Sequence, residues 1–243
     1  MIPEIEPHVF SNAVRSFWRT RDTQASNQER RGGSDTGTRT AVTGGHQMDG
    51  FTSVIREFIL SSGVLPSEIF SSHDKEVPGF FRPTKDWDIL VVSKHRLLAA
   101  IELKSQVGPS FGNNCNNRVE EAIGSAVDLW TAYREGAFEA SPQPWLGYLF
   151  LLEDCPKSRS LVKVSEPHFS VLPEFKRVSY AQRYELLCRK LVRERHYSSA
   201  CFLMANKDRA DASDNYSEPS NDLAANQFLT QLINHLNVEH GNT

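Results

Sequence analysis

Two acidic residues and a lysine near the middle of the chain have types and spacing that could support metal-assisted chemistry. They are Asp88, in PTKDWDIL (83–90), and the pair Glu102 and Lys104, in IELK (101–104). If both stretches are strands, alternation places Glu102 and Lys104 on one face and turns Leu103 toward the core. A tight hairpin would bring Asp88 beside Glu102. Two carboxylates and an ammonium group would then converge at one end of a sheet.

The residue types indicate which chemistry such a group could perform. Two carboxylates suit Mg²⁺, which keeps several waters and bridges to a phosphate. The metal would polarise the phosphoryl oxygens and lower the pKa of a bound water, while the ammonium orients or activates that water. The alternative is an ordinary surface salt bridge between Glu102 and Lys104, because such pairs are common. The otherwise apolar strand that ends in this motif favours the catalytic interpretation.

A polar stretch, GPSFGNNCNNR (108–118), follows the second strand and is predicted to be a loop. Asparagine can read adenine and arginine can read guanine through paired hydrogen bonds. Asparagine and glycine are also ordinary residues of turns and helix caps. For Asn117 we favour a cap, because Glu120 follows it at the spacing of a capping box. For Asn113, Asn114 and Arg118 both interpretations remain open.

Hydrophobic periodicity predicts the elements that position these residues. We expect helices over about 8–20, 49–62, 118–134, 179–195 and 222–238, and strands over 87–92, 97–103, 145–152 and 201–205. The four residues 93–96 would form the turn of the hairpin. This order predicts an α/β fold with a mixed central sheet flanked by helices. We expect a single domain over 1–243, with a mobile polar arm at 22–46 and an acidic loop at 206–222.

Composition limits the classes of protein that remain. The chain has 243 residues and a formal net charge of −3, yet residues 156–196 hold ten Lys and Arg against four Glu. Such a segment is either a solvated face or a contact with nucleic acid. No apolar run is long enough to span a membrane, and MIPEIEPHVF lacks the basic start of a secretory signal. Four well-separated cysteines indicate free thiols in a reducing cytoplasm.

Longer stretches carry a family resemblance. The chain resembles the XhoI-type restriction endonucleases of the PD-(D/E)xK nuclease superfamily. The matching stretches are GGHQMDGF (44–51), PGFFRPTKDWDILV (78–91), AAIELKSQVGPSFGNNCNNRVEEAIGSAVDL (99–129), LLEDC (151–155), PHF (167–169) and RYELLCRKL (183–191). The long central stretch is far more specific than the short motif of acids and lysine. The resemblance implies a restriction-endonuclease-like fold and covers most of the chain.

The resemblance also implies an activity. The chain would be a Mg²⁺-dependent type II restriction endonuclease that cuts double-stranded DNA at CTCGAG after the first C and leaves 5′-TCGA overhangs. It would act as a homodimer and be paired with a DNA methyltransferase. Asp88 and Glu102 would be metal ligands, together with the backbone carbonyl of Leu103, and Lys104 would be the catalytic lysine.

Several alternatives stay open. The superfamily often has a proline directly before the first aspartate, whereas Pro83 here stands further upstream, so Asp86 is a weaker candidate. A third acid could come from the preceding helix, as Asp49 or Glu57. The predicted DNA contacts are Arg82, Lys85, Asn113, Asn114, Asn116, Arg118, Lys157, Arg159, Arg189 and Lys190. Two rival functions are a structure-specific repair or junction nuclease and a decayed DNA-binding protein, and the presence of all three catalytic residues disfavours the second.

Overall fold

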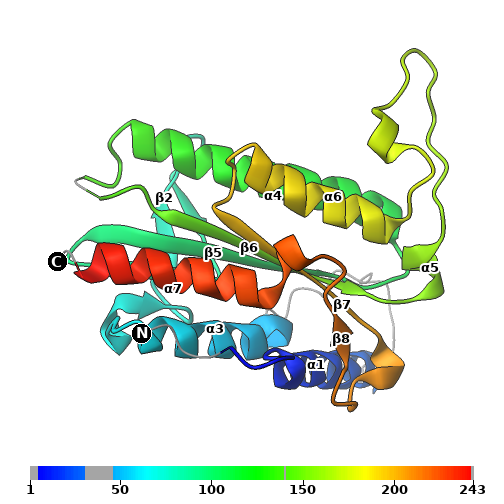
Figure 1. Cartoon of the computed structure of the whole chain (residues 1–243), viewed down its shortest axis with the longest axis horizontal. Helices are drawn as coiled ribbons and strands as arrows, with labels where there is room; N and C mark the ends of the chain where they lie inside the picture. Colours follow the sequence, from blue (N-terminus) through cyan, green and yellow to red (C-terminus); the bar gives the residue numbers. More distant parts are fainter. Residues whose placement is uncertain (1–4, 31–45, 140, 242–243) are drawn as a thin grey trace.

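The computed structural model describes residues 5–30, 46–139 and 141–241, which form one mixed β-sheet with helices on both faces (Figure 1). The six strands lie in the order β1-β4-β5-β6-β7-β8. Their bounds are β1 Ile69–Phe70, β4 Ile89–Ser93, β5 Arg96–Gln106, β6 Trp145–Glu153, β7 Ser199–Ala205 and β8 Tyr216–Ser217. Strands β5, β6 and β7 run parallel, and the other neighbours are antiparallel. The predicted α/β fold with a mixed central sheet is confirmed.

Helices cover the two faces of the sheet in two layers (Figure 1). Helices α1 Ser11–Arg30, α3 Asp49–Ser61 and α7 Ala225–Gly241 pack on one face, and α4 Phe111–Arg134 and α6 Tyr180–Arg193 pack on the other. A single turn, α5 Pro156–Arg159, follows β6. Short 3-10 helices are η1 His46–Met48, η2 Pro66–Glu68, η3 Pro173–Phe175, η4 Lys207–Arg209 and η5 Asn221–Leu223.

The central strands are apolar on both faces because both faces are covered. In β6, Tyr148 and Phe150 belong to the core under α4 and α6, whereas Leu149 and Leu151 belong to the core under α1, α3 and α7. All four side chains are at most 1 % exposed. The nearly unbroken apolar run of this segment therefore identified a buried central strand correctly.

The hairpin of β4 and β5 joins through a two-residue turn. Lys94 and His95 have φ angles of 48° and 63°, and Ser93 pairs with Arg96 across the turn. Positive φ at both central residues is the geometry that matches the twist of a tight hairpin. The register then places Ile89 opposite Ile101. Residue 88 consequently lies beside the second half of β5.

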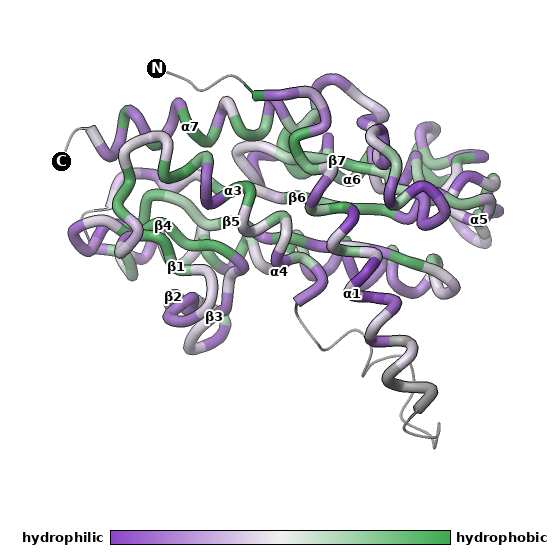
Figure 2. The backbone as a smooth tube through the Cα atoms, turned by 90° about the horizontal axis from the view of Figure 1, so that it is seen from below, coloured by the Kyte–Doolittle hydropathy of each residue, from purple (hydrophilic) through white to green (hydrophobic). Residues whose placement is uncertain are grey.

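A second, two-stranded sheet precedes this hairpin. Strands β2 Glu76–Pro78 and β3 Thr84–Asp86 pair antiparallel and project from the body of the molecule (Figure 2). The buried side chain of Trp87 anchors the link from β3 to β4. The sequence predicted one strand over 87–92, whereas the structure has this small sheet and then β4.

Helix α4 begins seven residues earlier than predicted, at Phe111, and its N-cap is Ser110 rather than Asn117. The reason is packing. Phe111 and Cys115 stand one turn apart and are 1 % and 6 % exposed, so they extend the buried stripe of the helix toward its start. This gain outweighs the poor helix propensity of the Gly and Asn residues between them.

Two polar segments also differ from expectation. Residues 22–30, predicted as the start of a mobile arm, continue α1, since no Gly or Pro interrupts the chain before Gly32. The remainder of that predicted arm, 31–45, lies outside the described residues. The predicted acidic loop at 206–222 contains η4, β8 and the start of η5, and β8 pairs with β7.

The four cysteines are free thiols, and three of them are buried. Within the described ranges, no helix has the length and apolar character needed to cross a membrane.

Candidate active site

The second half of β5 carries the central side chains of the site. Glu102 and Lys104 point toward α4, and Leu103 is buried in the opposite core, as alternation along the strand predicted. Asp88 is tied to the same strand by two hydrogen bonds. Its backbone N–H donates to the Ile101 carbonyl at 3.1 Å, and its Oδ2 accepts from the Leu103 N–H at 2.7 Å. The hairpin thus brings Asp88 beside Glu102, as the sequence predicted.

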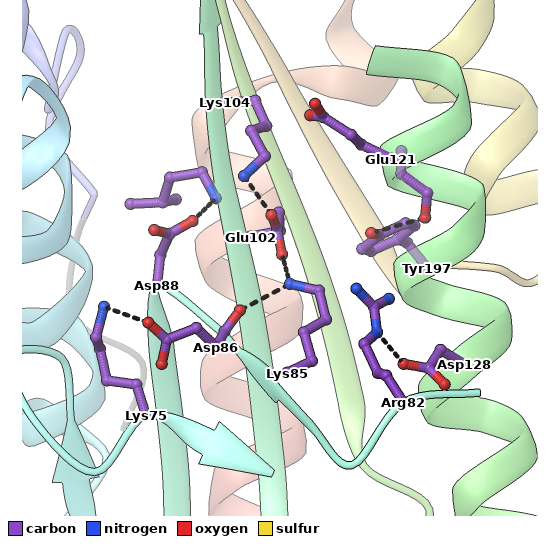
Figure 3. Close-up of polar contacts among 12 residues, drawn as sticks. Lys75, Arg82, Lys85, Asp86, Asp88, Glu102, Lys104, Glu121, Asp128 and Tyr197 are labelled. Atoms are coloured by element: carbon purple, nitrogen blue, oxygen red, sulfur yellow. Dashed lines mark hydrogen bonds and ion pairs between the residues drawn. The ribbon is translucent and has the colours of Figure 1, made fainter. Parts of the chain in front are cut away.

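Glu102 is a buried carboxylate held between two lysines (Figure 3). Lys85 Nζ lies 2.7 Å from Oε2, and Lys104 Nζ forms an ion pair with Oε1. The residue is only 4 % exposed. A surface salt bridge would leave both partners in water, and this pair is instead largely removed from it. The alternative of an ordinary surface pair therefore does not describe Glu102.

Lys85, which the sequence predicted to contact DNA, instead points its ammonium group into the protein. Its side chain is 11 % exposed, and its ammonium donates to Glu102 and, at 2.7 Å, to the carbonyl of Asp86. It also lies 4.4 Å from the centre of the Trp87 ring. Lys85 comes from β3, so the small sheet supplies a charge to the carboxylate on β5. The chain therefore places two lysines on Glu102, where the motif predicted one.

Burial and charge shift the pKa values of these groups in opposite directions. Burial, with the neighbouring charge of Glu102, raises the pKa of Asp88. Burial also acts to raise the pKa of Glu102, but the Lys104 and Lys85 ammonium groups outweigh it and lower that pKa. Burial acts to lower the pKa of Lys104, but the Glu102 and Asp88 carboxylates outweigh it and raise that pKa. Lys104 is therefore an ammonium ion beside an ionised Glu102.

An open hollow of about 470 Å³ lies in front of Glu102 and Lys104, and Asp88 is not part of its lining. Its lining comes from the β2–β3 connection, from β3, from β5 and from α4: Arg82, Thr84, Lys85, Asp86, Glu102, Lys104, Glu120, Glu121, Gly124 and Ser125. The sequence did not identify Glu120 and Glu121 as site residues. Only the crossing of α4 over β5 brings them there, and no motif signals that crossing.

The predicted base-reading residues lie on the first turns of α4 rather than on a loop. Asn113 and Asn116 are exposed, and Asn114 is half-buried. Arg118 forms an ion pair with Glu121, while its Nε is buried and has no hydrogen-bond partner among the described residues. The positive charge of Arg118 also opposes that of Lys104. Glu121 lines the hollow, so this ion pair places Arg118 beside the edge of the hollow.

Of the three alternative metal ligands, the structure brings only Asp86 to this hollow. Asp49 begins α3, is exposed and contacts His46 at 3.0 Å. Glu57 lines a separate hollow between α1 and α3. Asp86 does line the hollow, but its side chain is exposed and stands 3.9 Å from Lys75 (Figure 3). Glu102, which is buried, and Asp88, which is half-buried, are thus the carboxylates that could hold a metal.

Their chemistry fits a small divalent cation. Asp88 has one oxygen on the Leu103 N–H, and no hydrogen bond to its other oxygen is found among the described residues. Mg²⁺ commonly takes one or two protein carboxylates and fills its other positions with waters and substrate phosphate. Among the residues that the structure describes, no set of three His, Cys, Asp or Glu side chains could hold a metal. Asp88 and Glu102 would therefore be the two carboxylates available to such an ion.

Of the remaining predicted DNA contacts, Arg82 lines this hollow and the other four do not. Lys157 donates to the Pro109 carbonyl at 2.7 Å and lines a second hollow at the ends of β5 and β6. Arg159 pairs with Asp154. Arg189 pairs with Glu185 and Asp222, and Lys190 pairs with Glu174 at 2.9 Å. These cations therefore already have protein partners.

Comparisons with known proteins place this geometry in a family. The family model described as "Restriction endonuclease XhoI" matches residues 27–218. The type II restriction enzyme BstVI of Geobacillus stearothermophilus is 56 % identical over 212 residues, which is 85 % of this chain and 94 % of that protein. The type II restriction enzyme XhoI of Xanthomonas vasicola is 49 % identical over 181 residues, 74 % of this chain and 72 % of that protein. The type II restriction enzyme AbrI of Azospirillum brasilense is 49 % identical over 161 residues, 65 % of this chain and 71 % of that protein. No solved structure matches.

Proposed function

The chain belongs to the XhoI family of restriction endonucleases, and we propose that it cuts double-stranded DNA at the palindrome CTCGAG, after the first C, to leave 5′-TCGA overhangs. Site-specific cleavage of DNA is the activity of a type II restriction enzyme. The sequence CTCGAG comes from the resemblance of the central stretch to this family. One observation supports a functional site above all others, namely the buried Glu102 held beside Asp88 and between two lysines.

We assign the cofactor as Mg²⁺ and its protein ligands as Asp88, Glu102 and the carbonyl of Leu103. The bound ion would polarise the phosphate and lower the pKa of a water that attacks it. Two adjacent carboxylates, one buried and one half-buried, favour a bound cation, because each raises the free energy of the other's charge. Burial, together with the neighbouring charge of Glu102, raises the pKa of Asp88.

The two lysines of this chain have distinct proposed roles. Lys104 is an ammonium ion with a raised pKa, so it orients the attacking water and offsets charge in the transition state. Lys85 is less exposed and has three contacts, with Glu102, the Asp86 carbonyl and the Trp87 ring. It therefore fixes the Glu102 carboxylate in place. A phosphate entering the hollow would meet Lys104 first, because its side chain is 24 % exposed against 11 % for Lys85.

The proposed DNA contacts fall into two groups. Residues that would approach base edges are Asn113, Asn114, Asn116 and Arg118, and residues that would contact phosphates are Arg82, Lys157, Arg159, Arg189 and Lys190. Phosphate contacts position a duplex, whereas base contacts specify its sequence. Arg189 and Lys190 would exchange their present acidic partners for phosphates.

A palindromic site also implies partners. Two copies related by a two-fold axis would each read one half-site, so we propose a homodimer. A nuclease of this kind needs a DNA methyltransferase of the same specificity that protects the host DNA. The enzyme would act in the cytoplasm, where its free cysteines stay reduced.

Digestion of a plasmid of known sequence, followed by end mapping, tests the proposal. We expect discrete fragments whose ends all map to CTCGAG, complete loss of cleavage in EDTA, and recovery on adding Mg²⁺. Discrete ends at another sequence would refute the assigned site. A structure-specific nuclease would cut branched DNA and leave the plasmid uncut. A decayed DNA-binding protein would cut neither.

A further inference from the structure

The tip of the β2–β3 hairpin, residues 79–83, presents two large aromatic side chains to solvent. Phe80 and Phe81 are 50 % and 68 % exposed, and their rings meet edge to face with centroids 4.9 Å apart. Leaving aromatic surface in water is unfavourable. Two neighbouring exposed rings on a projecting element therefore indicate a contact surface rather than part of the core.

The tip is held in one conformation. Asp128 on α4 has a side chain that is only 2 % exposed, and its Oδ1 accepts hydrogen bonds from the backbone N–H groups of both phenylalanines, each at 2.8 Å. Its Oδ2 accepts from Arg82 Nε at 2.6 Å (Figure 3). A buried carboxylate thus fixes three consecutive residues at the tip.

Gly79 completes this arrangement. Its N–H donates to the Pro83 carbonyl at 3.2 Å and closes the tip. A Cβ at this position would lie 2.7 Å from both Asp128 Oδ2 and the Arg82 carbonyl. Glycine is therefore required for the close approach of the carboxylate. The aromatic pair is presented on a rigid support, so little conformational entropy would be lost when it binds a partner.

The location of the tip indicates the partner. Arg82 directly follows Phe81, and it lines the same hollow as Glu102 and Lys104. A duplex whose phosphate enters that hollow must pass over Arg82. It would then bring its bases within reach of the two rings. A second protein covering the rings would instead obstruct the path of the duplex.

Resting on the DNA cleavage assigned above, we propose that Phe80 and Phe81 form an aromatic wedge that enters a groove of the bound duplex next to the scissile phosphate. Apolar side chains, phenylalanine among them, insert between base steps in several DNA-binding proteins. Contacts of aromatic rings with bases also add affinity without charge. The wedge would hold the duplex in register while Arg82 contacts the backbone beside it.

The test compares the double variant Phe80→Ala/Phe81→Ala with the matched control Phe169→Ala. Phe169 is 88 % exposed and lines no part of the hollow. Gel shifts use a CTCGAG duplex in Ca²⁺, where binding is measured without cleavage. We expect the double variant to bind at least about tenfold more weakly and the control to bind within threefold of the parent. Thermal unfolding of both variants should match the parent, because the replaced side chains are exposed.

Salt dependence separates a ring contact from a disturbed phosphate contact. Removing uncharged rings leaves the number of neutralised phosphates unchanged, so the slope of log affinity against log salt should equal that of the parent. A smaller slope would show that the variant had displaced Arg82 or another phosphate contact, and it would overturn the proposal. Binding by the double variant within threefold of the parent would also overturn it.

Sedimentation without DNA tests the competing occupant, a second copy of this chain. The proposal requires the double variant and the parent to have the same oligomeric state. Loss of a parental dimer in the double variant would assign the rings to a protein interface and overturn the proposal. If the parent itself cleaves no DNA, the proposed function fails. If the parent cleaves and the double variant binds equally well, only the wedge fails.

Discussion

Two ammonium groups share the charge of Glu102, and they differ in what surrounds them. Lys85 contacts the carboxylate, a carbonyl and the Trp87 ring, whereas Lys104 is the more exposed of the two. A lysine with many protein contacts stabilises the arrangement of the site. A lysine whose side chain is partly exposed to solvent can also contact the substrate. We therefore expect Lys104, rather than Lys85, to act on the attacking water.

Replacing this lysine should separate DNA binding from cleavage. We expect Lys104→Ala to lose at least about 10²- to 10³-fold in cleavage rate, because a positioned group that stabilises transition-state charge is gone. Specific binding should change little, since Lys104 lies on the strand and not at the base edges. The measurement pairs gel shifts in Ca²⁺ with single-turnover cleavage in Mg²⁺ on one duplex. Lys94→Ala, at the opposite end of the same hairpin, is the control. Cleavage by Lys104→Ala within a few-fold of the parent would contradict the assignment.

The β4–β5 hairpin and the position of α4 show how far sequence reasoning extends. Alternation along β5 was enough to predict that Glu102 and Lys104 share a face, and turn length was enough to bring Asp88 beside them. Both inferences depend on geometry within one hairpin. Lys85, Glu120 and Glu121 reach the same hollow from β3 and α4. Their approach depends on packing between elements, which local periodicity does not encode.

The ends of the elements were harder to predict for a related reason. The start of α4 looked like a loop because Asn and Gly favour turns, but burial of Phe111 and Cys115 decides the outcome. Propensity is worth less than about 1 kcal/mol per residue, whereas burying a large apolar side chain contributes about 1.5–3 kcal/mol. The resemblance to a family contributed what neither pattern nor propensity contains, namely the proposed recognition sequence.

Asp128 links α4 to the hairpin tip, so removing its carboxylate should destabilise the folded protein. We expect Asp128→Ala to lower the free energy of unfolding by about 2 kcal/mol at neutral pH, because three donors lose a charged acceptor. Hydrogen bonds from Phe81, Arg82 and Phe80 outweigh burial and lower the pKa of Asp128. Its contribution is therefore complete above the unfolded pKa of about 3.9 and disappears as pH falls through the lower folded value.

Urea unfolding between pH 7 and pH 3 measures this difference. Glu120→Ala, an exposed acid on the same helix, is the control and should change stability little. A gap between the parent and Asp128→Ala that stays constant down to pH 3 would mean that the charge of the carboxylate contributes nothing. No gap at neutral pH would mean that the tip is held by other contacts.

Charge is distributed unevenly over the whole molecule, so net charge is a poor guide to DNA affinity. The chain has a formal charge of −3, while residues 156–196 carry an excess of Lys and Arg.

Each neutralised phosphate contributes about 0.9 to the slope of log affinity against log salt. We therefore expect steep salt dependence, and we expect Arg189→Ala/Lys190→Ala to reduce the slope by about 1.8. Arg15→Ala/Arg19→Ala, on α1, is the control, and its slope should match the parent's. An unchanged slope for the first variant would mean that Arg189 and Lys190 serve only their ion pairs within the protein.

A double-strand break at a palindrome needs two equivalent active sites, and the described part of each chain has one hollow with Glu102 and Lys104. One chain would therefore cut one strand, and a two-fold dimer would cut both. Co-expression of differently tagged parent and Lys104→Ala chains gives mixed dimers that can be isolated. We expect parent dimers to convert supercoiled plasmid to linear DNA, and mixed dimers to stop at nicked circles because only one of their two hollows is active.

If the enzyme works as a monomer, doubly tagged material would not be recovered, and sedimentation of the parent with and without its duplex would give the mass of a single chain. Recovery of mixed dimers that still linearise the plasmid at the parental rate would instead show that one hollow cuts both strands.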